Sequence, residues 1–137
     1  MRLSVGRPPA GGSGGGSSAA AVDSATGVGA AAGAAGAATV VDSASGMILG
    51  TAGAGLDMEI AAAGNTEVVR AKLKTMRALG LSDVIEDMLI TLGKQYHIIR
   101  PSASKEGVFI YVVLDKQRAN LALGRRKTQD ADKHMEF

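Results

Sequence analysis

Three apolar runs between Asp83 and Asp115 decide the fold: VIEDMLITL (84–92), YHIIR (96–100) and VFIYVVL (108–114). All three are rich in β-branched and aromatic residues, which favour extended strands. The segments between them carry turn-forming residues, first Gly93-Lys94 and then the stretch from Pro101 to Gly107. Runs of this kind separated by short turns predict three consecutive antiparallel strands.

Upstream of these runs, the sequence predicts a hairpin followed by a long helix. The hairpin joins Thr39–Asp42 to Met47–Thr51 through a Ser/Gly turn. The helix is expected over Leu56–Leu79, because acidic residues gather at its start and basic residues at its end, as the helix dipole favours. Downstream of the three strands, Asp115 is expected to cap a last helix that frays past residue 128.

Two apolar lines run along the predicted long helix. The first recurs at intervals of three and four residues and consists of Ala62, Val69, Leu73, Met76 and Leu79. The second lies on a neighbouring face and consists of Ile60, Gly64, Val68, Ala71 and Thr75. One line can pack on the sheet, and the other needs a different partner. Because residues 61–64 are small enough for another helix to approach closely, the pattern favours a homodimer.

The composition along the chain predicts three segments. Residues 1–38 are expected to form a flexible tail rich in Gly, Ala, Ser and Pro. Within this tail, residues 18–38 are compatible either with a weak helix or with a frayed segment, because alanine favours a helix and glycine opposes it. Residues 39–128 are expected to form the folded domain, and residues 129–137 a polar C-terminal end.

Composition and charge exclude several classes of protein. The chain has 137 residues, a net charge of +2 and no cysteine. The lack of cysteine excludes disulfides, thiolate zinc sites and cysteine nucleophiles. The weak charge and the 3% aromatic content do not indicate nucleic-acid binding. The sequence also lacks a secretory signal and an apolar stretch long enough to span a membrane, so we expect a cytoplasmic protein.

No constellation of residues in the sequence predicts catalysis. Glu86 and Asp87 are neighbours in a predicted strand, so they are expected to point to opposite faces. His97 and His134 lack further ligands at the spacing of a metal site. The glycine-rich loop at 50–55 lacks the lysine and hydroxyl of a phosphate-binding loop. We therefore predict no enzymatic activity, no cofactor and no metal.

Several cations are candidates for contact with a partner. Arg125-Arg126-Lys127, together with Arg118, forms a basic patch near the end of the chain. A solvated helix end that complements the dipole is favoured over an acidic partner or a membrane surface. The cations that we assign to a partner contact, without specificity for any one partner, are Lys94, Arg100 and Arg118.

Three stretches of the chain resemble the roadblock family: GNTEVVRAK (64–72), ITLGKQYHIIRP (90–101) and LDKQRANLAL (114–123). The family includes dynein roadblock-type light chains and the bacterial partners of Ras-like gliding-motility GTPases, and the predicted order of elements agrees with it. The resemblance covers about Thr39 to Lys127. The chain departs from the family where residues 18–38 are mainly Ala and Gly, and where small residues enter the last helix. One side of the sheet is therefore expected to be underpacked.

The resemblance implies an α+β (broadly α/β) fold of the roadblock/profilin-like type. In this fold, a five-stranded antiparallel sheet carries the long helix on one face and the terminal helices on the other. The resemblance also implies a homodimer through the long helix and the strand after it. We place the interface on Ala62, Asn65, Val69, Leu73, Met76, Met88 and Ile90.

In function, the resemblance implies a noncatalytic regulator or adaptor of a small Ras-like GTPase, or of a related signalling or motility assembly. Members of the family bind no nucleotide themselves, which agrees with the missing phosphate-binding loop. The alternative is a structural dimerisation module that has no GTPase partner.

Overall fold

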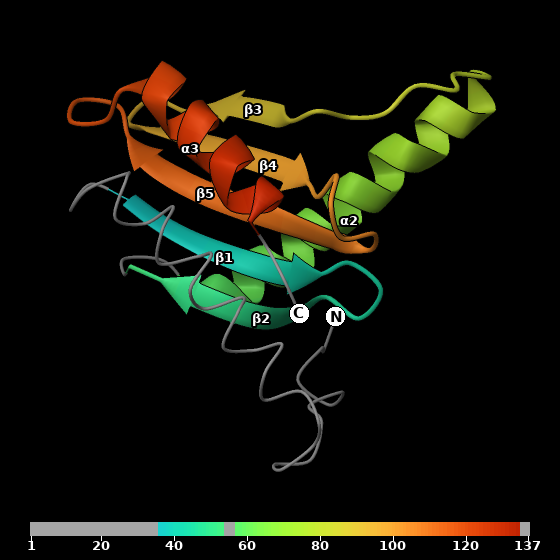
Figure 1. Cartoon of the computed structure of the whole chain (residues 1–137), viewed down its shortest axis with the longest axis horizontal. Helices are drawn as coiled ribbons and strands as arrows, with labels where there is room; N and C mark the ends of the chain where they lie inside the picture. Colours follow the sequence, from blue (N-terminus) through green and yellow to red (C-terminus); the bar gives the residue numbers. More distant parts are fainter. Residues whose placement is uncertain (1–35, 54–56, 135–137) are drawn as a thin grey trace, which may run out of the picture.

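The computed structural model of the chain describes residues 36–53 and 57–134. Within this part of the chain, five strands form one antiparallel sheet in the order β2-β1-β5-β4-β3, and one helix covers each face (Figure 1). The elements are β1 (Gly36–Asp42), β2 (Met47–Ala52), α2 (Met58–Ala78), β3 (Met88–Thr91), β4 (Gln95–Pro101), β5 (Val108–Asp115) and α3 (Leu121–Lys133). The predicted α+β class and five-stranded antiparallel sheet are confirmed.

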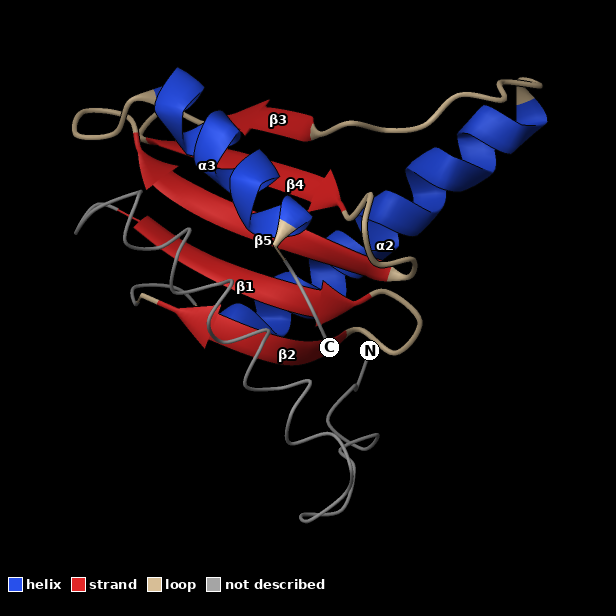
Figure 2. Ribbon diagram, viewed as in Figure 1, coloured by secondary structure: helices blue, strands red, loops and turns tan. Residues whose placement is uncertain are grey.

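The central strand β5 separates two apolar cores. Its side chains alternate between the two faces of the sheet, as the two-residue period of a strand requires. Phe109, Tyr111 and Val113 lie in the core that contains Ala62 and Val69 of α2. Ile110, Val112 and Leu114 lie in the other core, against residues of α3. Figure 2 shows the two helices on opposite sides of the sheet.

The helix α2 begins and ends with well-formed caps. The Asp57 carboxylate accepts hydrogen bonds from two backbone N–H groups of the first turn, at 3.1 and 3.2 Å. At the other end, Gly80 has a φ of 72°, a conformation that glycine adopts without strain. The chain can then turn so that the Leu81 N–H bonds back to the Met76 carbonyl oxygen at 2.9 Å. These caps confirm the predicted long helix, whose expected first residue, Leu56, lies outside the described residues.

The strand expected over residues 84–92 is shorter in the structure. It comprises only Met88–Thr91, so Glu86 and Asp87 lie before it instead of within it. Side chains from other elements hold these two residues. Arg100 donates a hydrogen bond to the Glu86 carbonyl oxygen at 3.1 Å, and the Asp87 carboxylate accepts from a residue of α3. These contacts replace strand pairing, and the predicted extent of the strand is wrong.

The last helix also differs from its prediction. Asn120, not Asp115, is its N-cap, and the Asn120 side chain accepts a hydrogen bond from the Leu123 N–H at 3.0 Å. Asp115 instead caps a turn that leads to the helix, where its carboxylate accepts from the Gln117 N–H at 2.8 Å. The helix continues to Lys133, so the fraying expected past residue 128 is wrong.

The small residues of α3 allow the helix to pack closely on the sheet instead of weakening that contact. Gly124 and Thr128 are buried against the sheet, and Ala131 packs on the same core. A Cβ atom on Gly124 would lie only 2.6 Å from Leu114 Cδ1. The helix can approach β5 this closely because it carries glycine there, so the expected underpacking beneath this helix is wrong.

The first strand begins earlier than predicted. β1 starts at Gly36, three residues before the expected first strand residue Thr39. Ala37 and Ala38 are buried, because β1 pairs with β5 from Gly36 onward. Tertiary pairing therefore overrides the weak strand preference of Ala and Gly. Residues 1–35, which include most of the predicted tail and weak helix, lie outside the described residues.

Candidate interaction surfaces

The side of α2 that faces the sheet belongs to the core of its own protomer. Ala62 is 0% exposed, Val69 is 3% exposed and Met76 is 7% exposed. Ala62 and Val69 pack with Ile99 and other residues of the sheet. A side chain buried in its own protomer is not available to a second copy. This burial corrects the assignment of Ala62, Val69 and Met76 to the dimer interface.

Exposed apolar side chains gather in one stretch of the chain. Of the ten large hydrophobic residues that are exposed among the described residues, seven lie between positions 73 and 92. We call these seven the 73–92 surface: Leu73, Leu79, Leu81, Val84, Leu89, Ile90 and Leu92. Figure 1 shows that the C-terminal half of α2 and the segment after it project beyond the sheet. These residues are close in sequence but lie on both faces of the sheet, since Leu89 pairs with Ile98 of the α3 core and Ile90 pairs with His97 on the α2 side.

Two predicted interface residues, Leu73 and Ile90, belong to the 73–92 surface, and each is 37% exposed. Met88 is half-buried and packs on the core beneath α2. Both Met88 and Ile90 lie in β3, the last strand at one side of the sheet. Between Met88 and Thr91 there is no proline or charged residue of the kind that protects an open strand edge from pairing. This edge can therefore accept a further strand.

The side of α2 opposite the sheet carries the second apolar line. Ile60 is 70% exposed and Val68 is 40% exposed. Gly64 lies between them, and a Cβ atom added to it would meet no heavy atom within 4 Å. Glycine inside a helix costs about 1 kcal/mol relative to alanine. Packing within the protomer gives no reason for this glycine.

A chain of polar side chains connects α2 to the sheet beside the 73–92 surface. Asn65 hydrogen-bonds to the Tyr111 hydroxyl, which lies 2.9 Å from His97 Nδ1. His97 Nε2 lies 3.0 Å from Gln95 Oε1. Because the amide oxygen of Gln95 only accepts, His97 donates from Nε2, and its Nδ1 accepts from Tyr111. Asn65 is thus engaged within its own protomer, and its place in a dimer interface stays a prediction.

Burial shifts the pKa of both ring residues in this chain. Burial lowers the pKa of His97 below its ordinary value of 6.5, so the ring is neutral near pH 7. Burial also raises the pKa of Tyr111, and the hydrogen bond from Asn65 opposes that rise without cancelling it. Both rings therefore remain uncharged. The sequence indicated only a sheet-surface histidine, because the contact with Tyr111 depends on the pairing of β4 with β5.

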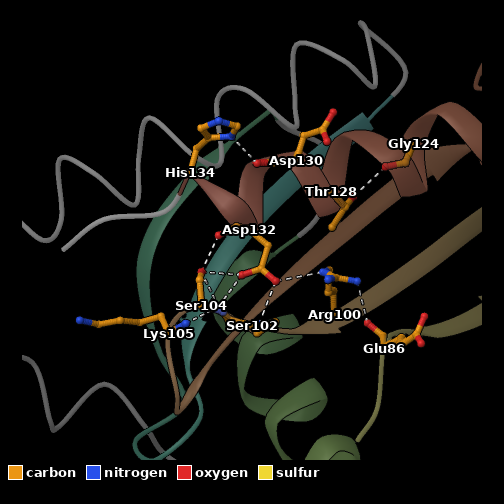
Figure 3. Close-up of polar contacts among 11 residues, drawn as sticks. Glu86, Arg100, Ser102, Ser104, Lys105, Gly124, Thr128, Asp130, Asp132 and His134 are labelled. Carbon is orange, nitrogen blue, oxygen red and sulfur yellow. Dashed lines mark hydrogen bonds and ion pairs between the residues drawn. The ribbon is translucent and has the colours of Figure 1, made fainter.

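The last turn of α3 is fastened to the loop between β4 and β5. Asp132 is 1% exposed, and its carboxylate accepts hydrogen bonds from Arg100 Nε at 3.1 Å, the Ala103 N–H at 2.9 Å and the Ser102 hydroxyl at 2.5 Å (Figure 3). The Ser104 hydroxyl lies 3.0 Å from the same carboxylate. Burial alone would raise the pKa of Asp132, but these hydrogen bonds outweigh it and hold that pKa below its ordinary value of 3.8. Asp132 is therefore ionised.

Arg100 has an internal role in this arrangement. Only 13% of its side chain is exposed, because the guanidinium lies between Asp132 and the backbone of Glu86. Figure 3 shows both contacts of the guanidinium, with the α3 carboxylate on one side and the Glu86 carbonyl group on the other. This geometry corrects the assignment of Arg100 to a partner contact.

A second ion pair joins α3 to the segment before β3. Arg125 Nε and Nη2 lie 3.0 and 2.7 Å from the two carboxylate oxygens of Asp87. This is the two-point geometry in which arginine binds a carboxylate most specifically. The hydrogen bond and charge of Asp87 raise the pKa of Arg125 above its ordinary value. Arg125 was expected only to complement the helix dipole, because nothing in the sequence pairs positions 87 and 125.

The other two predicted contact residues, Lys94 and Arg118, lie exposed on neighbouring loops at one end of the sheet. The loops are joined by a hydrogen bond of 3.0 Å from the Lys116 N–H to the Lys94 carbonyl oxygen. The ammonium group of Lys116 lies over the Tyr96 ring, 5.4 Å from its centroid. Several cations therefore face solvent together at this end. Contact of Lys94 and Arg118 with a partner stays a prediction.

Comparisons with known proteins show which solved structures share this fold. No protein-family model and no curated protein matches the sequence. Among solved structures, the gliding protein MglB of Thermus thermophilus superposes with a TM-score of 0.75 and 16% identity, over 88% of this chain and 89% of that one. Myxococcus xanthus MglB gives 0.67 at 17% identity, over 88% and 91% of the two chains. The chain has the fold of MglB.

The same fold is found in a roadblock/LC7 domain. The domain from Streptomyces avermitilis superposes with a TM-score of 0.62 and 13% identity, over 71% of this chain and 78% of that one. The MglB and roadblock matches together support the resemblance drawn from the sequence.

Within the MglB-like part of the chain that the structure describes, the catalytic candidates do not come together. Asp87 pairs with Arg125, and His97 pairs with Tyr111 and Gln95. Residues 36–53 and 57–134 hold no group of three His, Cys, Asp or Glu side chains that could bind a metal ion. Across the same residues, neither helix is long and apolar enough to cross a membrane.

Proposed function

We propose that this chain is a noncatalytic homodimer that regulates a small Ras-like GTPase, or that serves as an adaptor in a related signalling or motility assembly. The observation that carries the proposal is the 73–92 surface, which exposes seven large apolar side chains on a fold shared with MglB. A protomer that stayed alone would leave this surface in water. The roadblock resemblance of the sequence supports the same function, and a cytoplasmic location would suit such a partner.

Self-association is the first part of the proposal. We assign it to the projecting half of α2, the segment after it and the open edge of β3, which together carry the 73–92 surface. Two copies related by a two-fold axis would present the same surface to each other, as most homodimers do. Pairing of the two β3 edges would also satisfy backbone groups that the five-stranded sheet leaves without a neighbouring strand. One solved MglB structure is described as having a tetrameric arrangement, so related proteins do associate.

Binding of a GTPase is the second part. We assign the contact to the exposed cations Lys94 and Arg118, which lie together at one end of the sheet. The proposal requires acidic groups on the facing surface of the GTPase, because charge complementarity guides partners into contact. The protein itself binds no nucleotide in this scheme.

The experiment that tests the proposal has two steps. The first is the mass of the full chain in solution, measured by light scattering across a concentration series, which should be that of a dimer. The second is a pull-down with a small Ras-like GTPase of the gliding-motility type, loaded with GTP or with GDP. Lys94→Glu and Arg118→Glu should weaken capture, whereas the control Lys127→Glu, at an exposed position on α3, should not.

The outcomes separate the proposal from its alternative. A dimer that captures the GTPase supports both parts of the proposal. A dimer that captures no GTPase in either nucleotide state points to a structural dimerisation module. A chain that stays monomeric at the highest concentration contradicts the assignment of the 73–92 surface to self-association.

A further inference from the structure

Two arginine side chains tie the 73–92 surface to the opposite face of the sheet. We propose that α3 positions this surface for self-association, and that Arg125 and Arg100 are the positioning residues. The inference rests on the proposed function, in which the 73–92 surface joins two copies of the chain. It assigns α3 an effect on assembly although α3 contributes no residue to that surface.

The first bridge is the ion pair between Arg125 and Asp87. Arg125 Nε and Nη2 donate to the two carboxylate oxygens at 3.0 and 2.7 Å. Only 11% of the Asp87 side chain is exposed, so water competes little for its carboxylate. Asp87 is the residue immediately before Met88, the first residue of β3. The bridge therefore fixes the point at which the projecting segment enters the edge strand.

The second bridge runs through Arg100. Its Nη1 donates to the Glu86 carbonyl oxygen at 3.1 Å, and its Nε donates to the Asp132 carboxylate at 3.1 Å. Asp132 is itself held by the loop between β4 and β5, so this side of the bridge is rigid. Glu86 and Asp87 are consecutive in the chain. The two bridges thus hold adjacent residues from the α3 side of the molecule.

The segment has little else to hold it in place. Within the described residues, residues 82–87 form hydrogen bonds or ion pairs with other elements only through Arg100 and Arg125. Leu81 and Val84, which precede these contacts in the chain, are 51% and 78% exposed in the protomer. A segment that is fixed before binding loses less conformational entropy when a second copy docks on it. The bridges should therefore increase the affinity of one copy for another.

The coupling should operate in both directions. If fastening the segment to α3 favours association, then association must favour the fastened state to the same extent, because the two equilibria are linked. A molecule that binds α3 and removes Arg125 from Asp87 would then weaken the dimer without touching its interface. This places a control point for assembly on the face of the sheet opposite α2.

The test is a charge exchange across the first bridge in the full chain. Arg125→Glu and Asp87→Arg should each raise the dimer dissociation constant by roughly three- to tenfold, the range expected for a partly buried two-point ion pair. The double variant restores the opposite charges and should return the dissociation constant to within about twofold of wild type. Sedimentation equilibrium measures the dissociation constants, and circular dichroism checks that each variant is folded.

The matched control is Arg126→Glu, which changes the net charge as Arg125→Glu does. Arg126 is exposed on the same helix, and the ion pairs among the described residues do not include it. The control should leave the dissociation constant unchanged. The inference is overturned if Arg125→Glu behaves like Arg126→Glu, or if the double variant recovers the folded state but not the dimer.

A second readout separates this inference from the proposed function. Hydrogen exchange of the backbone amides of residues 82–90 reports how firmly the segment is held, and it can be measured on a monomer. Arg125→Glu and Asp87→Arg should speed this exchange, and the double variant should slow it again. If the wild type proves monomeric, the proposed dimer fails, while unchanged exchange in the two single variants would overturn the positioning role itself.

Discussion

Arg100 and Asp132 are 32 positions apart in the chain, yet their side chains form an ion pair of 3.1 Å that joins β4 to the last turn of α3. The carboxylate is 2% exposed and the guanidinium side chain 13% exposed, so the pair is largely withdrawn from water. Because the carboxylate also accepts from the loop between β4 and β5, its charge is fully compensated. The end of α3 is therefore fixed by polar contacts, and this explains why the helix does not fray.

Asp132→Asn should destabilise the protein by about 2 kcal/mol, since it removes a buried charge that several donors share. The amide keeps one acceptor oxygen but turns an N–H₂ group toward donors. Urea denaturation followed by circular dichroism measures the loss. Asp130→Asn, two residues earlier on the same helix, is the matched control and should have little effect. Equal stability of both variants would contradict the role given to Asp132.

Ionisation of the Asp132 carboxylate should make the free energy of unfolding depend on pH in the acid range. Its pKa in the folded protein lies below 3.8, so the unfolded chain binds the proton more readily than the folded protein does. The stabilisation is complete above the ordinary pKa and is lost as the pH falls through the lower, folded-state pKa. Wild type should therefore lose stability in this acid range, and Asp132→Asn should lose less.

Two glycines inside helices should respond to alanine in opposite ways. Gly124→Ala forces a methyl group to within 2.6 Å of Leu114 Cδ1, and Leu114 is fully buried. Repacking costs about 1–3 kcal/mol, which exceeds the gain of about 1 kcal/mol from helix propensity. Gly64→Ala meets no atom within 4 Å in the protomer, so only the gain in propensity remains.

Thermal unfolding distinguishes the two glycine variants. The melting temperature should fall for Gly124→Ala and rise for Gly64→Ala, and a change of 1 kcal/mol corresponds to about 4–8 °C in a domain of this size. Measurements at low protein concentration keep dimerisation from contributing to the shift. A lower melting temperature for Gly64→Ala would contradict the finding that residue 64 has open space around it in the protomer.

Local patterns in the sequence were enough to predict most of the fold. The run Val108–Leu114 is continuous in β-branched and aromatic residues, and it becomes the central strand that is buried on both faces. Asp57 and Gly80 cap the long helix as their residue types favour. In each case the residues that decide the element lie within it, so no knowledge of distant contacts is needed.

The structure differs from the sequence predictions where contacts between residues far apart in the chain determine the local conformation. Strand β3 begins only after Asp87, because the Asp87 carboxylate is bound by Arg125 of α3. From the sequence alone, Gly124 is expected to weaken α3. The structure shows that Leu114 occupies the space that a side chain at position 124 would need. The same limit applied to the two apolar lines of α2, because each has a helical period. Only the structure shows that Ala62, Val69 and Met76 of the first line are buried, whereas Leu73 and Leu79 of the same line are exposed.

His97 should also make stability depend on pH, in a range well above that of Asp132. Burial lowers its pKa in the folded protein below 6.5, so in this range the unfolded chain binds more protons than the folded protein. Its contribution is complete above pH 6.5 and is lost as the pH falls toward the lower, folded-state pKa. Protonation also places a hydrogen on Nδ1, where the Tyr111 hydroxyl now donates.

Urea denaturation from about pH 7.5 to about pH 5 tests the contribution of His97, because the unfolded histidine titrates in this range. His97→Gln should flatten the dependence of unfolding free energy on pH relative to wild type. His134→Gln, at an exposed position at the end of α3, should keep the wild-type slope. If His97→Gln keeps the full slope, another group is responsible for it.

Self-association should fail when a charge enters the 73–92 surface. Val84 is 78% exposed in the protomer, so Val84→Asp should leave the fold intact while placing a carboxylate in the apolar contact between copies. The dimer dissociation constant should rise by roughly tenfold or more. Ile60→Asp is the matched control, because Ile60 is similarly exposed, at 70%, but lies outside this surface in the first turn of α2.

Sedimentation velocity of the two aspartate variants across a concentration series decides the location of the interface. A folded monomer for Val84→Asp and a wild-type dimer for Ile60→Asp would place it on the 73–92 surface. The reverse result would place it on the outer line of α2, where Gly64 leaves open space. In that case the 73–92 surface is not the contact between copies, and the role proposed for the α3 bridges in self-association is overturned with it.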